Sequence, residues 1–158
     1  MITKVLFVCH GNICRSPLAQ GIFEHKISRL KLEKKISADS AAVSNYHTGE
    51  KPHAGSIAVA EKNGISIDHQ RARQVSIHDN GIFEYIIAMD RQVKGTLLQF
   101  YGCQSERVFL MNEFNKSEKK PDVPDPYGQG DEAFDEVFAM LERSIDAFIA
   151  HLRARHGV

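Results

Sequence analysis

Short apolar runs alternate along the chain with longer stretches in which apolar residues recur every three or four positions. The short runs are rich in apolar or small side chains and have the length of strands buried on both faces of a parallel sheet. They occupy residues 4–8, 36–43, 83–89 and 107–111. The longer stretches predict amphipathic helices, over residues 18–32, 52–63, 91–101 and from Gly130 or Asp131 onward. Since strands that alternate with helices form parallel βαβ units with right-handed crossovers, the pattern predicts an α/β fold, a doubly wound parallel sheet with helices on both faces.

The segments between these elements contain two notable carboxylates. Asp90 follows the third apolar run directly and is expected to cap the helix after it. Residues 116–130 form the longest stretch without a predicted element and hold three of the five prolines, and loops of this length usually carry function. Because Pro124 and Pro126 restrict the backbone on either side of Asp125, we expect its carboxyl group to be held in one place.

Composition and charge narrow the classes of protein. The 158 residues suffice for one domain, which we expect to span residues 1–158. Twenty basic residues balance twenty acidic ones, so no nucleic acid partner is expected. No apolar run is long enough to span a bilayer and no export signal is recognisable, so we expect no membrane insertion, a cytoplasmic location and three reduced cysteines. The eight histidines lack metal-ligand spacing, so neither a metal nor another cofactor is expected.

The stretch from Cys9 to Ser16 joins the end of the first strand to the start of a helix. Backbone N–H groups at such a turn converge on one spot and favour an anion. Cys9 is the candidate nucleophile, because those groups and a nearby guanidinium stabilise a thiolate. Arg15 can hold two oxygens of a tetrahedral anion, Ser16 can donate to the sulfur, and Gly11 allows the tight turn. The stretch therefore predicts an oxyanion site with a cysteine nucleophile.

The motif Val-Cys-x-Gly-Asn-Ile-Cys-Arg-Ser-Pro, residues 8–17, resembles the signature of the low-molecular-weight protein tyrosine phosphatases, and the similarity covers essentially the whole chain. The resemblance implies a flavodoxin-like sheet of four strands in the order 2-1-3-4, with the site at the carboxyl end of the first strand. It implies that tyrosine-phosphorylated proteins or peptides are hydrolysed through a cysteinyl phosphate on Cys9, and that inorganic phosphate or a similar oxyanion binds as product or inhibitor. Asp125 would be the general acid and base. The implied phosphate loop comprises Gly11, Asn12, Ile13, Cys14, Arg15 and Ser16.

The resemblance also assigns roles around this loop. Ser40 would brace Asn12, and His69 would form a hydrogen bond with Asn12. Tyr46 and Tyr127 would form aromatic walls of the substrate cleft. His10 stands where the family more often has an apolar residue, and it would face the cleft. Cys14 would protect the nucleophile by forming a disulfide with Cys9 after oxidation.

Three other functions share parts of this pattern. A thioredoxin-coupled arsenate reductase uses the same fold, but it needs two further cysteines near the third strand, and residues 78–95 contain none. A phosphoarginine phosphatase tends to carry threonine where this chain has Ile13. A phosphopeptide-binding module without catalytic activity would have no use for Asp125. Cys103, far along the chain from the loop, is expected to be structural.

Overall fold

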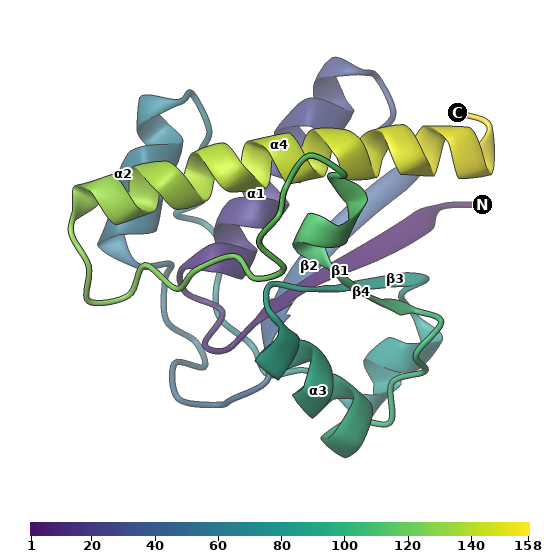
Figure 1. Cartoon of the computed structure of the whole chain (residues 1–158), viewed down its shortest axis with the longest axis horizontal. Coiled ribbons are helices and arrows are strands. Elements are labelled where there is room, and N and C mark those ends of the chain that lie inside the picture. Colours follow the sequence, from purple (N-terminus) through teal and green to yellow (C-terminus); the bar gives the residue numbers. More distant parts are fainter.

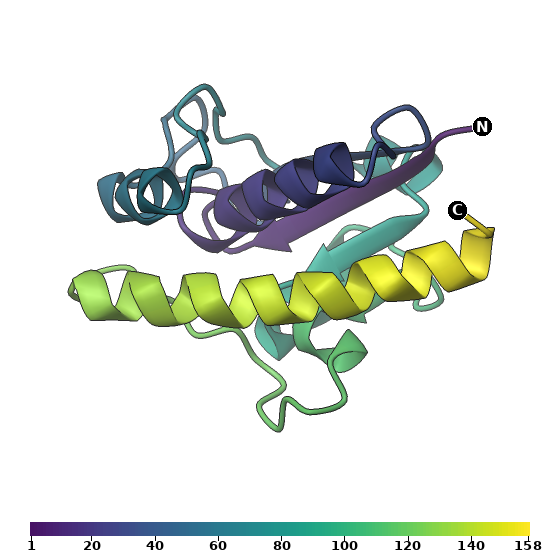
Figure 2. The same cartoon turned by 90° about the horizontal axis from the view of Figure 1, so that it is seen from above.

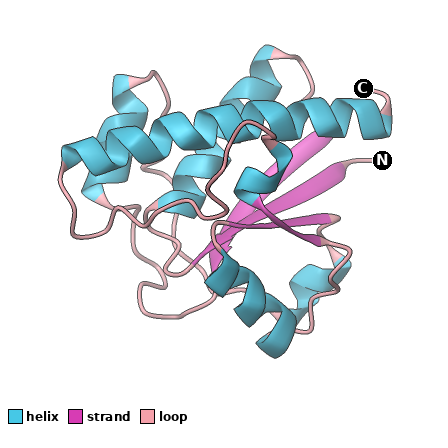
Figure 3. Ribbon diagram, in the orientation of Figure 1, coloured by secondary structure: helices cyan, strands magenta, loops and turns pink.

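The computed structural model describes residues 1–158, and its centre is a four-stranded sheet whose strands are all parallel (Figures 1 and 3). The strand order is β2-β1-β3-β4, which confirms the expected order 2-1-3-4. The strands are β1 (Thr3–Cys9), β2 (Ile36–Ala42), β3 (Tyr85–Ala88) and β4 (Val108–Leu110). In the register, Cys9 pairs with Ala42 and Val8 with Ala88, so the ends of three strands meet at one edge of the sheet.

Helices cover both faces of the sheet, as predicted. They are α1 (Arg15–Arg29), α2 (Ala54–Lys62), α3 (Arg91–Phe100) and α4 (Asp131–His156), with short 3₁₀ helices η1 (Ile77–Gly81) and η2 (Met111–Phe114). Figure 2 shows α4 running along most of the length of the molecule. Helices α1, α2 and α4 share one apolar cluster, whereas α3 packs in a second cluster with other strand residues. None of the helices combines the length and apolar character that crossing a bilayer would require.

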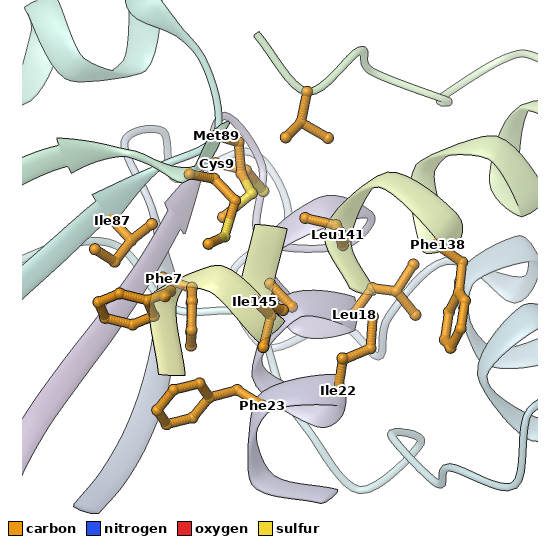
Figure 4. Packing of buried hydrophobic residues seen from close by; sticks show 14 of the residues in the cluster. Phe7, Cys9, Leu18, Ile22, Phe23, Ile87, Met89, Phe138, Leu141 and Ile145 are labelled. Atoms are coloured by element: carbon orange, nitrogen blue, oxygen red, sulfur yellow. The ribbon is translucent and has the colours of Figure 1, made fainter. Parts of the chain in front are cut away.

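The alternation of side chains along β1 explains why there are two clusters. Successive side chains of a strand point to opposite faces, so Val5, Phe7 and Cys9 join the larger cluster while Leu6 and Val8 join the smaller one. Figure 4 shows part of the larger cluster, in which Phe7 meets Phe23 edge to face with ring centroids 5.3 Å apart. The same alternation turns Cys9 toward the face of the sheet that α1 covers.

The ends of the helices differ from the predictions in ways that local chemistry explains. Helix α1 begins at Arg15 rather than Leu18, because a proline at the third helical position lacks only an N–H that would have no intrahelical partner. It ends at Arg29, shortly before Lys31, whose φ of 60° is left-handed. Neither 3₁₀ helix was predicted from the sequence. Asp90 caps α3 as predicted, since its Oδ1 accepts a hydrogen bond from the Val93 N–H at 2.7 Å.

The long loop after η2 has neither helix nor strand up to Gly130, as predicted. It is nevertheless tied to the sheet, because the Val123 N–H donates to the Met89 carbonyl at 2.8 Å and the Val123 side chain is buried. This attachment lies just beyond the end of β3. It brings the Asp125 segment to the edge at which Cys9 ends β1.

Candidate active site

The sulfur of Cys9 lies among hydrogen-bond donors. Cys9 ends β1 and is only 2% exposed. Its Sγ accepts the Asn12 N–H at 3.2 Å and lies 3.0 Å from the Ser16 Oγ. Donors around a sulfur favour the thiolate, which is the nucleophilic form.

Asn12 sets the shape of the loop. Its φ of 58° is left-handed, a conformation that asparagine tolerates better than most residues with side chains. Its buried side chain makes three hydrogen bonds: Nδ2 donates to Ser16 Oγ at 2.7 Å and to Ser40 Oγ at 3.0 Å, and Oδ1 accepts the Arg73 N–H at 3.0 Å. The expected bond to Ser40 is present, and the loop is thereby joined to β2 and to the segment around Arg73.

The expected hydrogen bond between His69 and Asn12 is wrong. His69 is exposed, and the partners of the Asn12 side chain are Ser16, Ser40 and the Arg73 N–H. The next residue, Gln70, is buried in its place: Nε2 donates to the Pro17 carbonyl at 2.9 Å, and Oε1 lies 3.4 Å from Ser40 Oγ. A tight turn, closed by a hydrogen bond from the Gln70 N–H to the Ile67 carbonyl, accompanies the burial of Ile67 and Gln70 and leaves His69 outside.

Arg15 begins α1 with its guanidinium buried, the residue being 3% exposed. Nη1 donates to Asp90 Oδ2 at 2.7 Å and to the Val123 carbonyl at 2.9 Å. Burial disfavours the cation, but the negative charge of Cys9 and the hydrogen bond to Asp90 outweigh it and raise the pKa of Arg15 above its usual value. Nε is buried without a hydrogen-bond partner. Arg15 is therefore a buried cation whose hydrogen bonds to the protein all come from Nη1.

Asp90 thus has a second role that the sequence did not reveal. One carboxylate oxygen caps α3 and the other orients Arg15. The contact joins residues 75 positions apart. No local pattern signals such a pairing.

The three residues expected to carry the chemistry line one pocket of about 170 Å³. The Asp125 carboxylate is exposed toward solvent and is held by its Oδ1, which accepts the Tyr127 N–H at 3.1 Å. Ser16, Asn12 and Ser40 lie behind the pocket wall rather than in it. The pocket is lined by Cys9, His10, Gly11, Ile13, Cys14, Arg15, His47, Asp125 and Tyr127.

Aromatic rings flank the mouth of the pocket. The His10 ring lies 5.7 Å from the ring of Tyr46, which is 73% exposed. Tyr127 lies 6.3 Å from His47 and 5.6 Å from His53, measured between ring centroids. Neither histidine was predicted from the sequence, because His47 lies in a loop without periodicity and His53 stands at the start of a predicted helix, where nothing marks it as part of a site. His53 also caps α2, its Nδ1 accepting the Gly55 N–H at 2.9 Å.

The other two cysteines have different environments. Burial, and then the negative charge of Cys9, raise the pKa of Cys14 to about 12, so its thiol keeps its proton at neutral pH. Cys103 is buried in the smaller apolar cluster, whereas Cys9 and Cys14 belong to the larger one. Cys103 therefore packs on the opposite face of the sheet from the two loop cysteines, in agreement with its expected structural role.

The sequence matches proteins of known family along nearly its whole length. The family model described as low molecular weight phosphotyrosine protein phosphatase matches residues 4–157. The low molecular weight protein-tyrosine-phosphatase YfkJ of Bacillus subtilis is 39% identical over 151 residues, which cover 95% of this chain and 96% of that protein. The low molecular weight phosphotyrosine protein phosphatase of Gallus gallus is 35% identical over 152 residues, or 94% of each chain.

Solved structures agree with these matches. The crystal structure of Bacillus subtilis YfkJ superposes with a TM-score of 0.92 at 36% identity and covers 98% of this chain and 97% of its own. A protein tyrosine phosphatase from Entamoeba histolytica, crystallised with Hepes in the active site, superposes with a TM-score of 0.90 at 34% identity over 98% of both chains. The resemblance noticed in residues 8–17 thus extends to sequence and fold throughout, and the chain belongs to the low molecular weight phosphotyrosine protein phosphatase family.

Proposed function

We propose that this protein hydrolyses phosphotyrosine in proteins or peptides through a cysteinyl-phosphate intermediate, with Cys9 as nucleophile and Asp125 as general acid and base. The observation that carries the proposal is the buried Arg15 cation. Its Nε has no hydrogen-bond partner in the protein, and Arg15 lines the same pocket as Cys9 and Asp125. A phosphate oxygen would supply the acceptor that Arg15 Nε lacks.

In the first step, the Cys9 thiolate attacks phosphorus and the bond from phosphorus to the tyrosyl oxygen breaks. Protonated Asp125 gives its proton to that oxygen, so tyrosine leaves as a neutral phenol. The loop N–H groups and Arg15 hold the phosphoryl oxygens as their charge redistributes. Ser16, at 3.0 Å, stabilises the sulfur as attacking group and later as leaving group.

In the second step, water attacks the phosphorus of the cysteinyl phosphate and gives a proton to the Asp125 carboxylate. The sulfur–phosphorus bond breaks, inorganic phosphate is released and the Cys9 thiolate is restored. Tyr127 lines the catalytic pocket and Tyr46 lines the hollow that adjoins it, and both are exposed aromatic side chains suited to contact the tyrosyl ring. A thiolate nucleophile has to remain reduced, and we therefore propose that the protein works in the cytosol.

Arsenate reduction would require the electrons to pass through a relay of cysteines. Cys103 packs in the cluster on the far face of the sheet, and the 78–95 segment contains no cysteine. The available thiols therefore favour hydrolysis.

The test compares wild type with Asp125→Asn on aryl phosphates whose phenols differ in pKa. We expect Asp125→Asn to slow the poor leaving groups far more than the good ones, because a phenol of low pKa leaves without a proton. Asp122→Asn is the matched control, since Asp122 is in the same loop but pairs with the exposed Arg91. An equal loss for every leaving group would exclude Asp125 as the acid, and turnover by Cys9→Ser would exclude the cysteinyl phosphate.

A further inference from the structure

The catalytic pocket continues into a second, larger hollow of about 600 Å³. Both hollows have His10, Arg15 and Asp125 in their lining, so they meet at the reacting centre. From there the larger hollow extends between residues 43–46, which follow β2, and the first turns of α3. Its volume is typical of ligand sites, whereas the 170 Å³ pocket has room for little beyond a phosphate and part of a ring. We call the larger hollow the side groove.

Part of the lining of the side groove consists of uncharged hydrogen-bonding side chains. Three carboxamides, those of Asn45, Gln74 and Gln92, come from three separate segments of the chain. The Asn45 and Gln92 side chains make no hydrogen bond within the protein, and the Gln74 amide uses only its Nε2, which donates to the Tyr101 hydroxyl at 2.9 Å. Each carboxamide offers an N–H donor and a carbonyl acceptor. This is the same pair of groups that an extended peptide backbone presents at every residue.

The charges in the side groove do not favour a charged ligand. Arg15 and Asp90 neutralise one another through their 2.7 Å ion pair. Asp125 and His10, both shared with the catalytic pocket, are the other ionisable groups on its catalytic side. Domains that recognise phosphorylated or acidic motifs do so through clusters of arginine. The side groove has no such cluster, so its chemistry suits neutral polypeptide rather than an acidic segment or nucleic acid.

The walls of the side groove are already fixed before any ligand binds. The Ser44 N–H and Oγ both donate to the His10 carbonyl, at 3.1 and 2.9 Å. The Tyr101 hydroxyl donates to the Val43 carbonyl at 2.6 Å, which ties the loop after β2 to the end of α3. A preformed groove avoids the cost of ordering side chains and loops on binding.

We propose that the side groove binds the polypeptide backbone next to the phosphotyrosine, so that the preferred substrate is a phosphotyrosine within an extended peptide. This inference rests on the proposed phosphatase function. Asn45 and Gln92 would donate to and accept from the peptide groups adjoining the phosphorylated residue. Both lie outside the 170 Å³ catalytic pocket, and they would therefore act on peptide substrates alone.

The test measures kcat/KM for a capped phosphotyrosine amino acid and for two uncharged phosphotyrosine peptides, one extended before and the other after the phosphorylated residue. We expect at least one extension to raise kcat/KM. Asn45→Ala and Gln92→Ala should each lower the value for that peptide by roughly two- to tenfold, the effect of losing one or more hydrogen bonds. Neither should alter turnover of the capped amino acid. Gln99→Ala is the matched control, because Gln99 is an exposed glutamine of α3 that does not line the groove.

Each outcome separates the groove from the phosphatase function. Rates that are equal for the capped amino acid and both peptides would overturn the groove while leaving the phosphatase function intact. So would an Asn45→Ala or Gln92→Ala variant that loses activity equally on all substrates, or a Gln99→Ala variant that behaves like Gln92→Ala. Absence of hydrolysis of every aryl phosphate would overturn the phosphatase function and the groove with it.

Discussion

Replacing Asn12 by alanine tests whether the phosphate loop is held by one buried amide. Alanine removes the three side-chain hydrogen bonds to Ser16, Ser40 and the Arg73 N–H. It also places alanine, which rarely adopts the left-handed conformation, at a φ of 58°. Both changes act on the segment that places the Asn12 N–H against the Cys9 sulfur.

The cost follows from these two contributions. A buried hydrogen bond contributes about 0.5–1.5 kcal/mol net, so three of them give about 1.5–4.5 kcal/mol. A left-handed alanine adds roughly 1–2 kcal/mol. We therefore expect Asn12→Ala to lower the free energy of unfolding by about 2.5–6.5 kcal/mol. The free energy of unfolding of a domain of this size is usually roughly 5–15 kcal/mol. The variant should therefore be folded at low temperature and unfold at a lower temperature than wild type.

Asn12→Gly separates the two contributions, because glycine adopts positive φ without strain. We expect this variant to be about 1 kcal/mol more stable than Asn12→Ala. It should nevertheless lose most activity on aryl phosphates, since nothing then fixes the direction of the N–H at residue 12. Urea unfolding followed by circular dichroism gives the stabilities, and initial rates give the activities.

Two results would refute this reasoning. Wild-type activity in Asn12→Gly would mean that the backbone conformation alone matters and that the amide network is dispensable. Stabilities of both variants within experimental error of wild type would mean that the hydrogen bonds to Ser16, Ser40 and Arg73 contribute nothing.

Two further substitutions test the residues around the nucleophile. Asp90→Asn keeps a good helix cap but removes the charge facing Arg15, so kcat/KM for aryl phosphates should fall about tenfold or more, as expected for the loss of a charged hydrogen bond. Asp90→Ala should in addition lower the unfolding free energy by about 1 kcal/mol, because the helix cap is lost. Unchanged kinetics in both variants would show that Arg15 is oriented without Asp90. After peroxide treatment and then a dithiol, Cys14→Ser should recover much less activity than wild type, because the Cys9 sulfenic acid would have no neighbouring thiol to capture it. Equal recovery in the two proteins would leave Cys14 as a packing residue.

The raised pKa of Cys14 bears on that redox prediction. At neutral pH Cys14 is a protonated thiol, so peroxide should oxidise Cys9 first. Burial is the largest cause of the raised pKa of Cys14, and the negative charge on Cys9 is the second. Conversion of the thiolate to a sulfenic acid removes that charge, which lowers the pKa of Cys14 and favours its attack on the oxidised sulfur. We therefore expect peroxide to oxidise Cys9 before Cys14.

The sequence predicted the sheet well because strands and helices leave periodic patterns. The short apolar run at residues 4–8 marked β1, and the cap at Asp90 was visible from a single residue before a helix. The choice between His69 and Gln70 was not visible, because the 65–75 segment has no periodicity to say which side chain points inward. Only the turn at Ile67 decides that choice.

The functional contacts that the sequence did not reveal share one physical origin. Arg15 meets Asp90 across 75 positions and the Val123 carbonyl across 108, and both partners lie at the edge where β1 and β3 end. Parallel pairing of Val8 with Ala88 brings these ends together, and the hydrogen bond from the Val123 N–H to Met89 adds the loop that carries Asp125. The catalytic geometry is therefore a consequence of strand register. A change that shifted β3 by one residue would turn its side chains to the other face and separate Asp90 from Arg15, even with every residue of the phosphate loop unchanged.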